Sequence, residues 1–371
     1  MHQGSLPPPG AAPERIVGFD VARALAVLGM VMVNYKGQLD SAERGPDWLV
    51  WLNERIEGRS AALFVVLAGI GLSLRSRRAR IDPATHLAFE RSALLRRAVV
   101  LYGAGLLNLH LWEWDILHFY GLFLAVAAGL LTAPGLELAI VGLACIVGSV
   151  ALQASFPYEV EAIDIWSPTG ALSDLFFNGL HPFFPWMAFV VLGMWLGRLP
   201  LGESATRRRL VTAAIPVLLI SEGLDTWATR FHESLPIDPE HVYWLSTWPR
   251  APRPLYVLAA GAMATLLICG CIEVTKNRGQ DRWVLALSAT GQLAFSLYIL
   301  HAIAILIPLE HELLDHSSLA ETMAYSFAFY AGAVALSLWW RRRFLHGPLE
   351  TLIRQIAGRT SPGHPRDLAT K

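Results

Sequence analysis

The chain has 371 residues, of which 54% are hydrophobic and only 16% are charged. A soluble domain carries about 25% charged residues, so the composition excludes an ordinary soluble protein. The net charge is zero, which gives no sign of a nucleic-acid partner. Apolar residues occur in blocks long enough to cross a bilayer, and we therefore predict an all-α, polytopic membrane bundle.

The sequence divides into one membrane domain and two tails. We expect residues 1–14, which are rich in proline and glycine, and residues 358–371 to be disordered, and residues 15–357 to form the domain. Within the domain, hydropathy predicts about ten spans. They lie at roughly 16–36, 60–76, 93–112, 115–132, 136–154, 183–198, 209–226, 252–274, 284–307 and 321–340.

Arginine is concentrated in alternate connections. Basic residues follow the second, sixth, eighth and last predicted spans, and the connections between them are acidic. The positive-inside rule then places both termini in the cytoplasm. We expect a multi-pass protein of the bacterial cytoplasmic (inner) membrane.

The first predicted span carries three polar residues, Asp20, Arg23 and Asn34. At 100° per residue they fall within roughly 60° of one another on the helix surface. Charged groups are costly in hydrocarbon, so such a stripe faces a bundle interior and marks a pathway or a site. Asp20 and Arg23 could simply form an ion pair that helps the helix to insert. Alternatively, Arg23 could receive a phosphate-rich donor from the cytoplasm.

A second polar group is expected at the outer ends of the spans. His110, Asp115 and His118 flank a very short turn, and Asn178 and His181 open the sixth span. A carboxylate beside a histidine can fix its tautomer and raise its basicity, as proton removal from a hydroxyl or amine requires. The simpler alternative is that these histidines are interfacial residues, each with one hydrogen bond.

Other candidates have plainer interpretations. We expect His301, deep in the ninth span, to be a buried ring bonded to a neighbouring helix. Trp112 and the other tryptophans near the outer loops suit interfacial anchoring, with sugar stacking as the alternative. The three cysteines suit buried packing, and because no Cys or HExxH spacing is present we expect no metal site.

Seven strings along the chain carry a resemblance. They are FDVARALAVLGMVMVNY, FVVLAGIGLSL, LLRRAVVLYGAGLL, WDILHFYGL, NGLHPFFPWMAFVVLGMWLGRL, GQLAFSLYILH and RRRFLHGPLETLIRQ. In this order they resemble the transmembrane acyltransferase superfamily. That group includes the heparan-α-glucosaminide N-acetyltransferase relatives and the bacterial YeiB-like family of unknown function (DUF418).

The resemblance implies an activity. It implies a donor, acetyl-CoA or another acyl-CoA, that enters from the cytosol, and a glycan or glycolipid acceptor that waits at the outer face, surrounded by membrane lipid. It also leaves a homodimer open. Asn34 matches the asparagine of the family's VNY motif, which helps to form the acetyl-transfer site. The glucosaminide enzymes carry their catalytic histidine in the following loop, but this chain has no histidine there.

These implications give residue roles. We expect His110 or His118 to be the general base, Asp115 to orient it, and Asn34 to stabilise the thioester oxyanion. The CoA phosphates would bind at the cytoplasmic end of the first span, and the residues assigned to the donor are Asp20, Arg23, Arg96 and Arg97. The acceptor would lie at the outer face, and the residues assigned to it are Asn178, His181 and Trp112.

Two other functions use the same polar stripe. A transporter or flippase for a small molecule or lipid could line its path with these residues. The absence of an evident internal repeat counts against transport. A non-catalytic family member is the third interpretation, because the loop histidine is missing.

Overall fold

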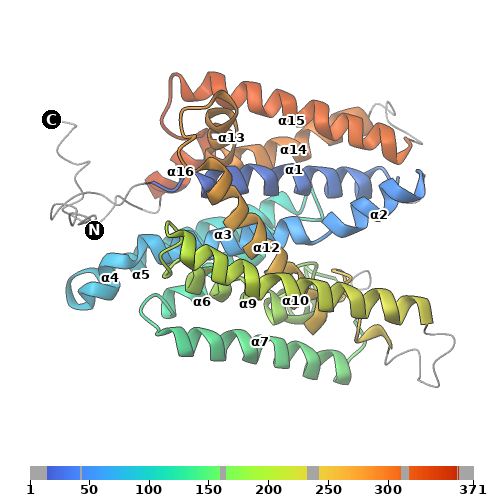
Figure 1. The fold of residues 1–371 in the computed structure, drawn as a ribbon, viewed down its shortest axis with the longest axis horizontal. Coiled ribbons are helices and arrows are strands. Elements are labelled where there is room, and N and C mark those ends of the chain that lie inside the picture. The colour runs from blue at the N-terminus through green and yellow to red at the C-terminus, as the bar shows by residue number, and fades with distance from the viewer. Residues whose placement is uncertain are drawn as a thin grey trace.

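The computed structural model describes residues 15–41, 44–158, 164–231, 242–310, 317–356 and Gly358. Over these residues the regular structure is entirely helical, which confirms the predicted all-α class (Figure 1). Both predicted disordered tails lie outside the described residues, apart from Gly358.

The helices follow one another along the chain with short connections. Their bounds are α1 Gly18–Gln38, α2 Asp47–Ile56, α3 Arg59–Arg75, α4 Arg77–Ile81, α5 Pro83–Asn108, α6 Leu117–Gly129, α7 Gly135–Ser155, α8 Pro168–Ser173, η1 Asp174–Asn178, α9 Phe183–Leu196, α10 Ser204–Phe231, α12 Pro254–Thr275, α13 Arg282–Gln292, α14 Ala294–Glu310, α15 Leu319–Arg341 and α16 Pro348–Ile356.

Local sequence signals start several of these helices. Asp82 precedes α5, and its side chain accepts a hydrogen bond from the backbone N–H of Thr85 at 3.3 Å. This bond lowers the pKa of the Asp82 carboxyl. Ser318 and Glu321 form a reciprocal capping box at the start of α15.

Six described helices are long and apolar enough to cross a membrane. They are α1, the Asp47–Arg75 pair of α2 and α3, α7, α10, α12 and α15. Two further pairs, α8–η1 with α9 and α13 with α14, are bent by 50° and 78°, and they raise the number to eight if each is one span. The two remaining predicted spans fall on α5 and α6, and α6 has only 13 residues. A polytopic helical membrane protein is confirmed, with shorter and more broken spans than the hydropathy profile predicts.

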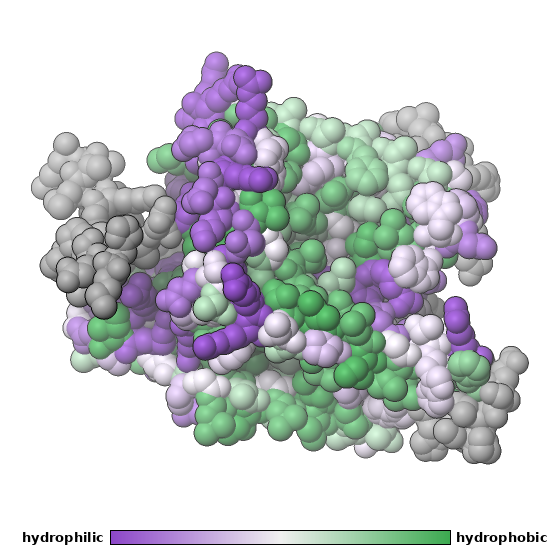
Figure 2. Space-filling model, viewed as in Figure 1, coloured by the Kyte–Doolittle hydropathy of each residue, from purple (hydrophilic) through white to green (hydrophobic). Residues whose placement is uncertain are grey.

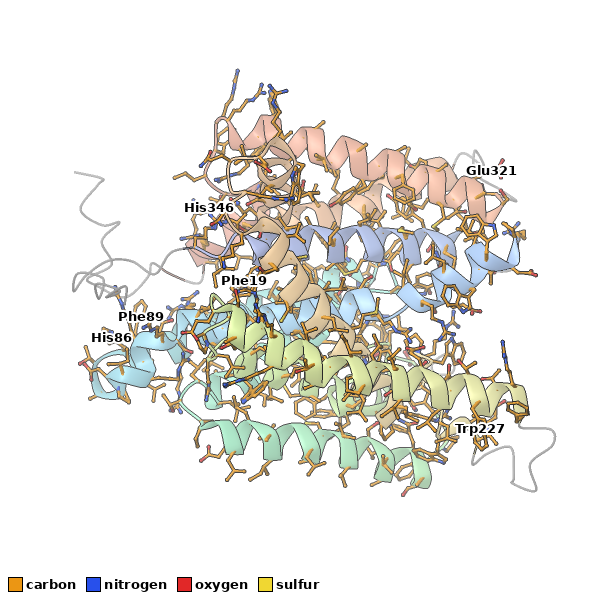
Figure 3. The ribbon with its side chains drawn as sticks, in the orientation of Figure 1. Phe19, His86, Phe89, Trp227, Glu321 and His346 are labelled. Atoms are coloured by element: carbon orange, nitrogen blue, oxygen red, sulfur yellow. The ribbon has the colours of Figure 1, made fainter. Side chains whose placement is uncertain are left out.

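The two ends of the bundle differ in character. α4 and α16 lie at the left end in Figure 1, together with the end of α15, where arginine-rich connections occur. Figure 2 shows hydrophilic residues gathered at this end and an apolar band across the middle. His86 and His346 lie toward the left end, whereas Trp227 and Glu321 lie at the opposite end (Figure 3). This arrangement agrees with the orientation that the positive-inside rule predicts.

α1 lies inside the bundle and contacts helices from both halves of the chain. It packs against α2 and α3, and also against α12, α13, α14 and α15. Most of its residues are buried, including Asp20 and Tyr35. The polar stripe of α1 therefore faces protein, as the cost of charge in hydrocarbon requires.

Glycine permits close contact between α3 and α9. A Cβ atom on Gly69 would overlap the carbonyl oxygen of Val190, and one on Gly193 would overlap that of Val66. Small residues of this kind let helix backbones approach closely in membrane bundles.

We expect Gly69→Ala to destabilise the protein by about 1–3 kcal/mol, because the added methyl must push α3 and α9 apart. Thermal unfolding of the detergent-purified protein measures the change. Gly71→Ala is the matched control, since a methyl at Gly71 of the same helix meets nothing within 4 Å. Equal stability of the two variants would contradict the close crossing.

Candidate active site

α1 and α14 meet through a contact between an amide and an imidazole. Nδ2 of Asn34 lies 2.8 Å from Nε2 of His301. The other ring nitrogen, Nδ1, faces the carbonyl oxygen of Tyr298, which can only accept a hydrogen bond. These partners assign the proton to Nδ1, so Nε2 is the lone-pair nitrogen and Asn34 donates to it. A basic nitrogen is therefore held against the amide of Asn34.

Tyr298 continues the polar contacts from α14 to the turn before α6. Its hydroxyl donates to Oδ1 of Asp115 at 3.1 Å. The Asp115 carboxylate is fully buried and also accepts from Nδ2 of Asn108 at 2.8 Å and from the backbone N–H of Leu117 at 2.7 Å. Burying a carboxylate is costly unless donors surround it, and these three donors offset that cost.

His118 lies between two carboxylates. Its Nδ1 is 3.5 Å from Oδ2 of Asp115, and its Nε2 is 3.0 Å from Oδ2 of Asp174. Both N–H groups have an acceptor when the ring is doubly protonated, so neither nitrogen is free to take a proton from a substrate. His118 therefore suits an electrostatic and positioning role better than that of a base.

Asp174 comes from an unusual helical turn. It opens η1, a π-helical segment, and its carbonyl oxygen accepts from the N–H of Gly179 at 3.1 Å. π-helical turns are rare and occur often at functional sites. Here the turn directs the carboxylate of Asp174 to His118.

These side chains form one continuous chain of contacts, which we call the polar network: Asn34, His301, Tyr298, Asp115, His118 and Asp174. Three of its members, Asp115, His118 and His301, are 0%, 3% and 1% exposed. Titratable groups buried in a membrane bundle mark functional sites.

Close backbone contact brings the turn of Asp115 against α5. A Cβ atom on Gly105 would overlap the backbone nitrogen of His118 and lie 2.9 Å from Oδ2 of Asp115. Only glycine leaves the space in which this carboxylate reaches both helices.

The structure places His110 apart from the polar network. Its ring is exposed and stacks on Trp166, with ring centroids 4.7 Å apart and planes 11° apart. His110 comes two residues after α5 ends at Asn108, and it is exposed whereas Asp115 is buried. Of the predicted trio, only Asp115 and His118 come together.

Trp112 is also not an interfacial residue. It is 2% exposed and packs edge-on against the ring of His301, with centroids 5.6 Å apart. Its apolar ring is buried because the turn after α5 folds inward over α14, so Trp112 forms a wall of the network and not a free stacking surface.

Asn178 and His181 lie beside the Asp174 end of the network. Asn178 donates to Oγ of Ser173 at 3.3 Å. The ring of His181 packs edge-on against two aromatic rings, with its centroid 4.4 Å from that of Trp186 and 5.9 Å from that of Phe119. In the part of the chain that the structure describes, Oδ1 of Asn178 and Nδ1 of His181 are buried without hydrogen-bond partners.

The other end of α1 carries the predicted ion pair. Arg23 donates to Oδ1 of Asp20 at 3.2 Å, and Asp20 also accepts from Arg15 at 2.5 Å and from Oγ of Ser288 at 3.3 Å. The side chain of Arg23 remains 28% exposed, so the pair does not exhaust its capacity to bind an anion.

Arg97 lies near both Arg23 and Arg75, and also near Tyr120 and Glu350. Nε of Arg75 donates to Oε2 of Glu90 at 2.9 Å. Among the residues that the structure describes, the hydroxyl of the buried Tyr120 has no hydrogen-bond partner. Positive charge and a spare hydroxyl thus gather near the start of α1, and this group of Arg23, Arg75, Arg97 and Tyr120 is called the arginine cluster.

Two families of known proteins match parts of this chain. Residues 15–223, more than half of the chain, match the family described as heparan-alpha-glucosaminide N-acetyltransferase, catalytic. The chain belongs to this family. Residues 201–360 match a family described as protein of unknown function, DUF418. No curated protein matches the chain.

Membership of the heparan-alpha-glucosaminide N-acetyltransferase catalytic family points to a transferase in a membrane. The match covers Asn34, Asp115, His118 and Asp174, together with the arginine cluster. Tyr298 and His301 lie in the stretch that matches the DUF418 family. The polar network therefore joins residues from both matched stretches.

Sequence reasoning missed the importance of three residues. Asp174 stands among several acidic residues in the connection before the predicted sixth span, and the sequence predicts His301 only as a buried ring bonded to a neighbouring helix. The structure confirms that partner and identifies it as Asn34. Tyr298 stands three residues before His301 in the string GQLAFSLYILH, and that spacing was the available signal.

Proposed function

We propose that the protein moves an acetyl or other acyl group from cytosolic acyl-CoA to a hydroxyl or amine of an envelope glycan or glycolipid at the outer face. The contact between Asn34 and Nε2 of His301 carries this proposal. It places a base beside the asparagine of the VNY motif, which is what acyl transfer requires.

The chemical step uses both side chains. Asn34 first turns from Nε2 of His301 to the thioester oxygen, which leaves the lone pair of Nε2 open. The proton of the acceptor then passes to Nε2 as the acceptor oxygen or nitrogen bonds to the thioester carbonyl carbon. Asn34 donates a hydrogen bond to the oxyanion that forms on this carbon. The carbon–sulfur bond then breaks, and the CoA sulfur leaves with the proton that His301 returns.

The arginine cluster suits the donor's phosphates. Arg23 and Asn34 are eleven residues apart on α1, which is about 16 Å along the helix axis. An extended pantetheine arm bridges such a distance, so phosphates at Arg23, Arg75 and Arg97 would leave the acyl group near Asn34. Arginine is well suited to this task because its planar fork pairs with phosphate oxygens.

The remaining network supports the base. Tyr298 fixes the tautomer of His301 through its carbonyl oxygen, and its hydroxyl is anchored on Asp115. His118, whose Nε2 contacts Asp174, holds that carboxylate from the other side. Such supporting contacts keep a reacting group in the productive geometry.

Donor binding gives a direct test. We expect acetyl-CoA to bind the purified protein, and Arg97→Gln to weaken binding by about 10- to 100-fold, because each charge-assisted bond contributes about 1.5–3 kcal/mol. Isothermal titration calorimetry in detergent measures the dissociation constant.

Arg78→Gln is the matched control, since Arg78 is exposed on α4 at the same end of the bundle. A dissociation constant of about 1 mM corresponds to a binding free energy of only about −4 kcal/mol. If wild-type protein binds no CoA species at this concentration, the acyltransferase proposal fails and transport becomes the better explanation.

A further inference from the structure

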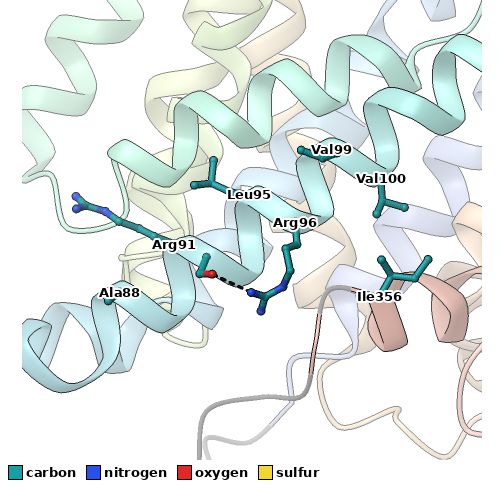
Figure 4. Close-up of a pocket in the computed structure, with 8 residues that line it drawn as sticks. Ala88, Arg91, Leu95, Arg96, Val99, Val100 and Ile356 are labelled. Atoms are coloured by element: carbon teal, nitrogen blue, oxygen red, sulfur yellow. Dashed lines mark hydrogen bonds between the residues drawn. The ribbon is translucent and has the colours of Figure 1, made fainter.

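α5 and α16 enclose a groove on the surface of the bundle. Its lining combines two arginines, a serine and apolar side chains: Arg91, Ser92, Leu95, Arg96, Val99 and Ile356. Figure 4 shows Arg96 turned back along α5 in a hydrogen bond, with Ile356 of α16 to its right, whereas Arg91 points to the other side. The residues from α5 recur every three or four positions, so they share one face of the helix.

Polarity changes along this face in one direction. Arg91 and Ser92 lie nearer to the start of α5, and Val99 follows eight residues after Arg91, about 12 Å further toward the apolar middle of the bundle. Among the residues that the structure describes, Val99 is 73% exposed and Leu95 is 45% exposed. A polar end followed by an exposed apolar strip is the order of a phospholipid headgroup and its acyl chain.

The arginines at the polar end are held in place by short contacts. Arg96 donates to Oγ of Ser92 at 2.8 Å, and Nε of Arg91 donates to the carbonyl oxygen of Ala128 at 3.1 Å. Arg96 and Arg97 are adjacent in sequence, so their side chains leave α5 about 100° apart. Arg97 turns to the arginine cluster, whereas Arg96 turns to the groove.

α16 places the groove at the level of the lipid headgroups. It is a short helix with apolar residues exposed on one side, including Leu352 and Ile356. Its opposite side is tied to the bundle, because Glu350 accepts from the backbone N–H of Phe295 at 2.9 Å. Helices of this kind lie in the plane of a membrane interface.

We propose that this groove binds an anionic phospholipid of the cytoplasmic leaflet. The lipid phosphate lies on Arg96, and Arg91 adds positive charge at the same end of the groove. One acyl chain follows Leu95 and Val99. Arginine pairs well with phosphate oxygens, and the cytoplasmic leaflet is the anionic one. This site goes beyond the acyl-transfer proposal and does not depend on it.

Lipid retention tests the proposal. The protein is placed in nanodiscs of phosphatidylcholine with a minor fraction of phosphatidylglycerol, and the lipid that remains bound is counted by native mass spectrometry. We expect wild type to retain phosphatidylglycerol, and the Arg91→Gln/Arg96→Gln variant to retain it about 30-fold less, because two basic residues are removed from the polar end of the groove. Val99→Gln should weaken retention through the acyl chain alone.

The control is Arg278→Gln/Arg282→Gln, which removes two exposed arginines outside the groove. Unfolding temperatures in phosphatidylcholine alone show that each variant is folded. Unchanged retention in the groove variant, or an equal loss in the control, would overturn the proposal. If inorganic phosphate stabilises wild type as much as phosphatidylglycerol does, the groove binds free phosphate and the lipid assignment is wrong.

Discussion

His301→Ala is expected to lower the rate of acyl transfer by about 10²- to 10⁴-fold, which is the contribution of a positioned general base. The physical reason is the lone pair on Nε2, which faces Asn34 because Nδ1 donates its proton to the carbonyl oxygen of Tyr298. Acyl-CoA binding should persist, because the arginine cluster is untouched. Transfer of a radiolabelled acetyl group in proteoliposomes measures the rate, and calorimetry measures donor binding.

His110→Ala is the matched control, because this histidine is exposed and stacks on Trp166, which lies outside the polar network. It should retain the wild-type rate. Asn34→Ala should lower the rate of acyl transfer by about 10²- to 10³-fold, which is the usual effect of removing one hydrogen-bond donor from an oxyanion hole. A wild-type rate in His301→Ala, combined with loss in His118→Ala, would contradict our assignment and make His118 the base.

Asp115→Ala is expected to destabilise the protein by about 3–5 kcal/mol, because it leaves the partners of a buried charge without their acceptor. The side chains of Asn108 and Tyr298 and the backbone N–H of Leu117 all donate to this carboxylate. Thermal unfolding in detergent measures the loss. Activity should also fall, since Asp115 anchors the residue that orients His301.

Asp115→Asn separates charge from hydrogen bonding. It keeps one acceptor oxygen, so the loss of stability should be smaller than in Asp115→Ala. Glu113→Ala is the control, because Glu113 is exposed two residues away in the same turn. Equal unfolding temperatures for Asp115→Ala and Glu113→Ala would show that the buried carboxylate does not organise this turn.

Much of the fold could be predicted without coordinates. Long apolar blocks can bury their backbone polar groups in a membrane only as helices, so composition and length determine the all-α class. The spacing of Asp20 and Arg23 on one helical face predicts their contact, which depends on local geometry alone. The same local rule predicts the contact of Asp115 with His118 across three residues.

Other features were harder to predict because they depend on helix ends. Hydropathy assigns His110 and His118 to one polar group, but α5 ends at Asn108, so the chain beyond it turns His110 outward and Trp112 inward. The predicted ninth span, 284–307, is bent by 78° between α13 and α14, and a window of mean hydropathy averages over such a bend.

The sequence by itself determined which residues share a face of one helix, and thereby the buried polar stripe of α1 and the family to which the chain belongs. Only the tertiary structure decided which helix covers that stripe. Asn34 and His301 are 267 positions apart, and His118 and Asp174 are 56 apart. Periodicity along a helix carries no information about its neighbours, whose choice depends on side-chain packing over the whole bundle.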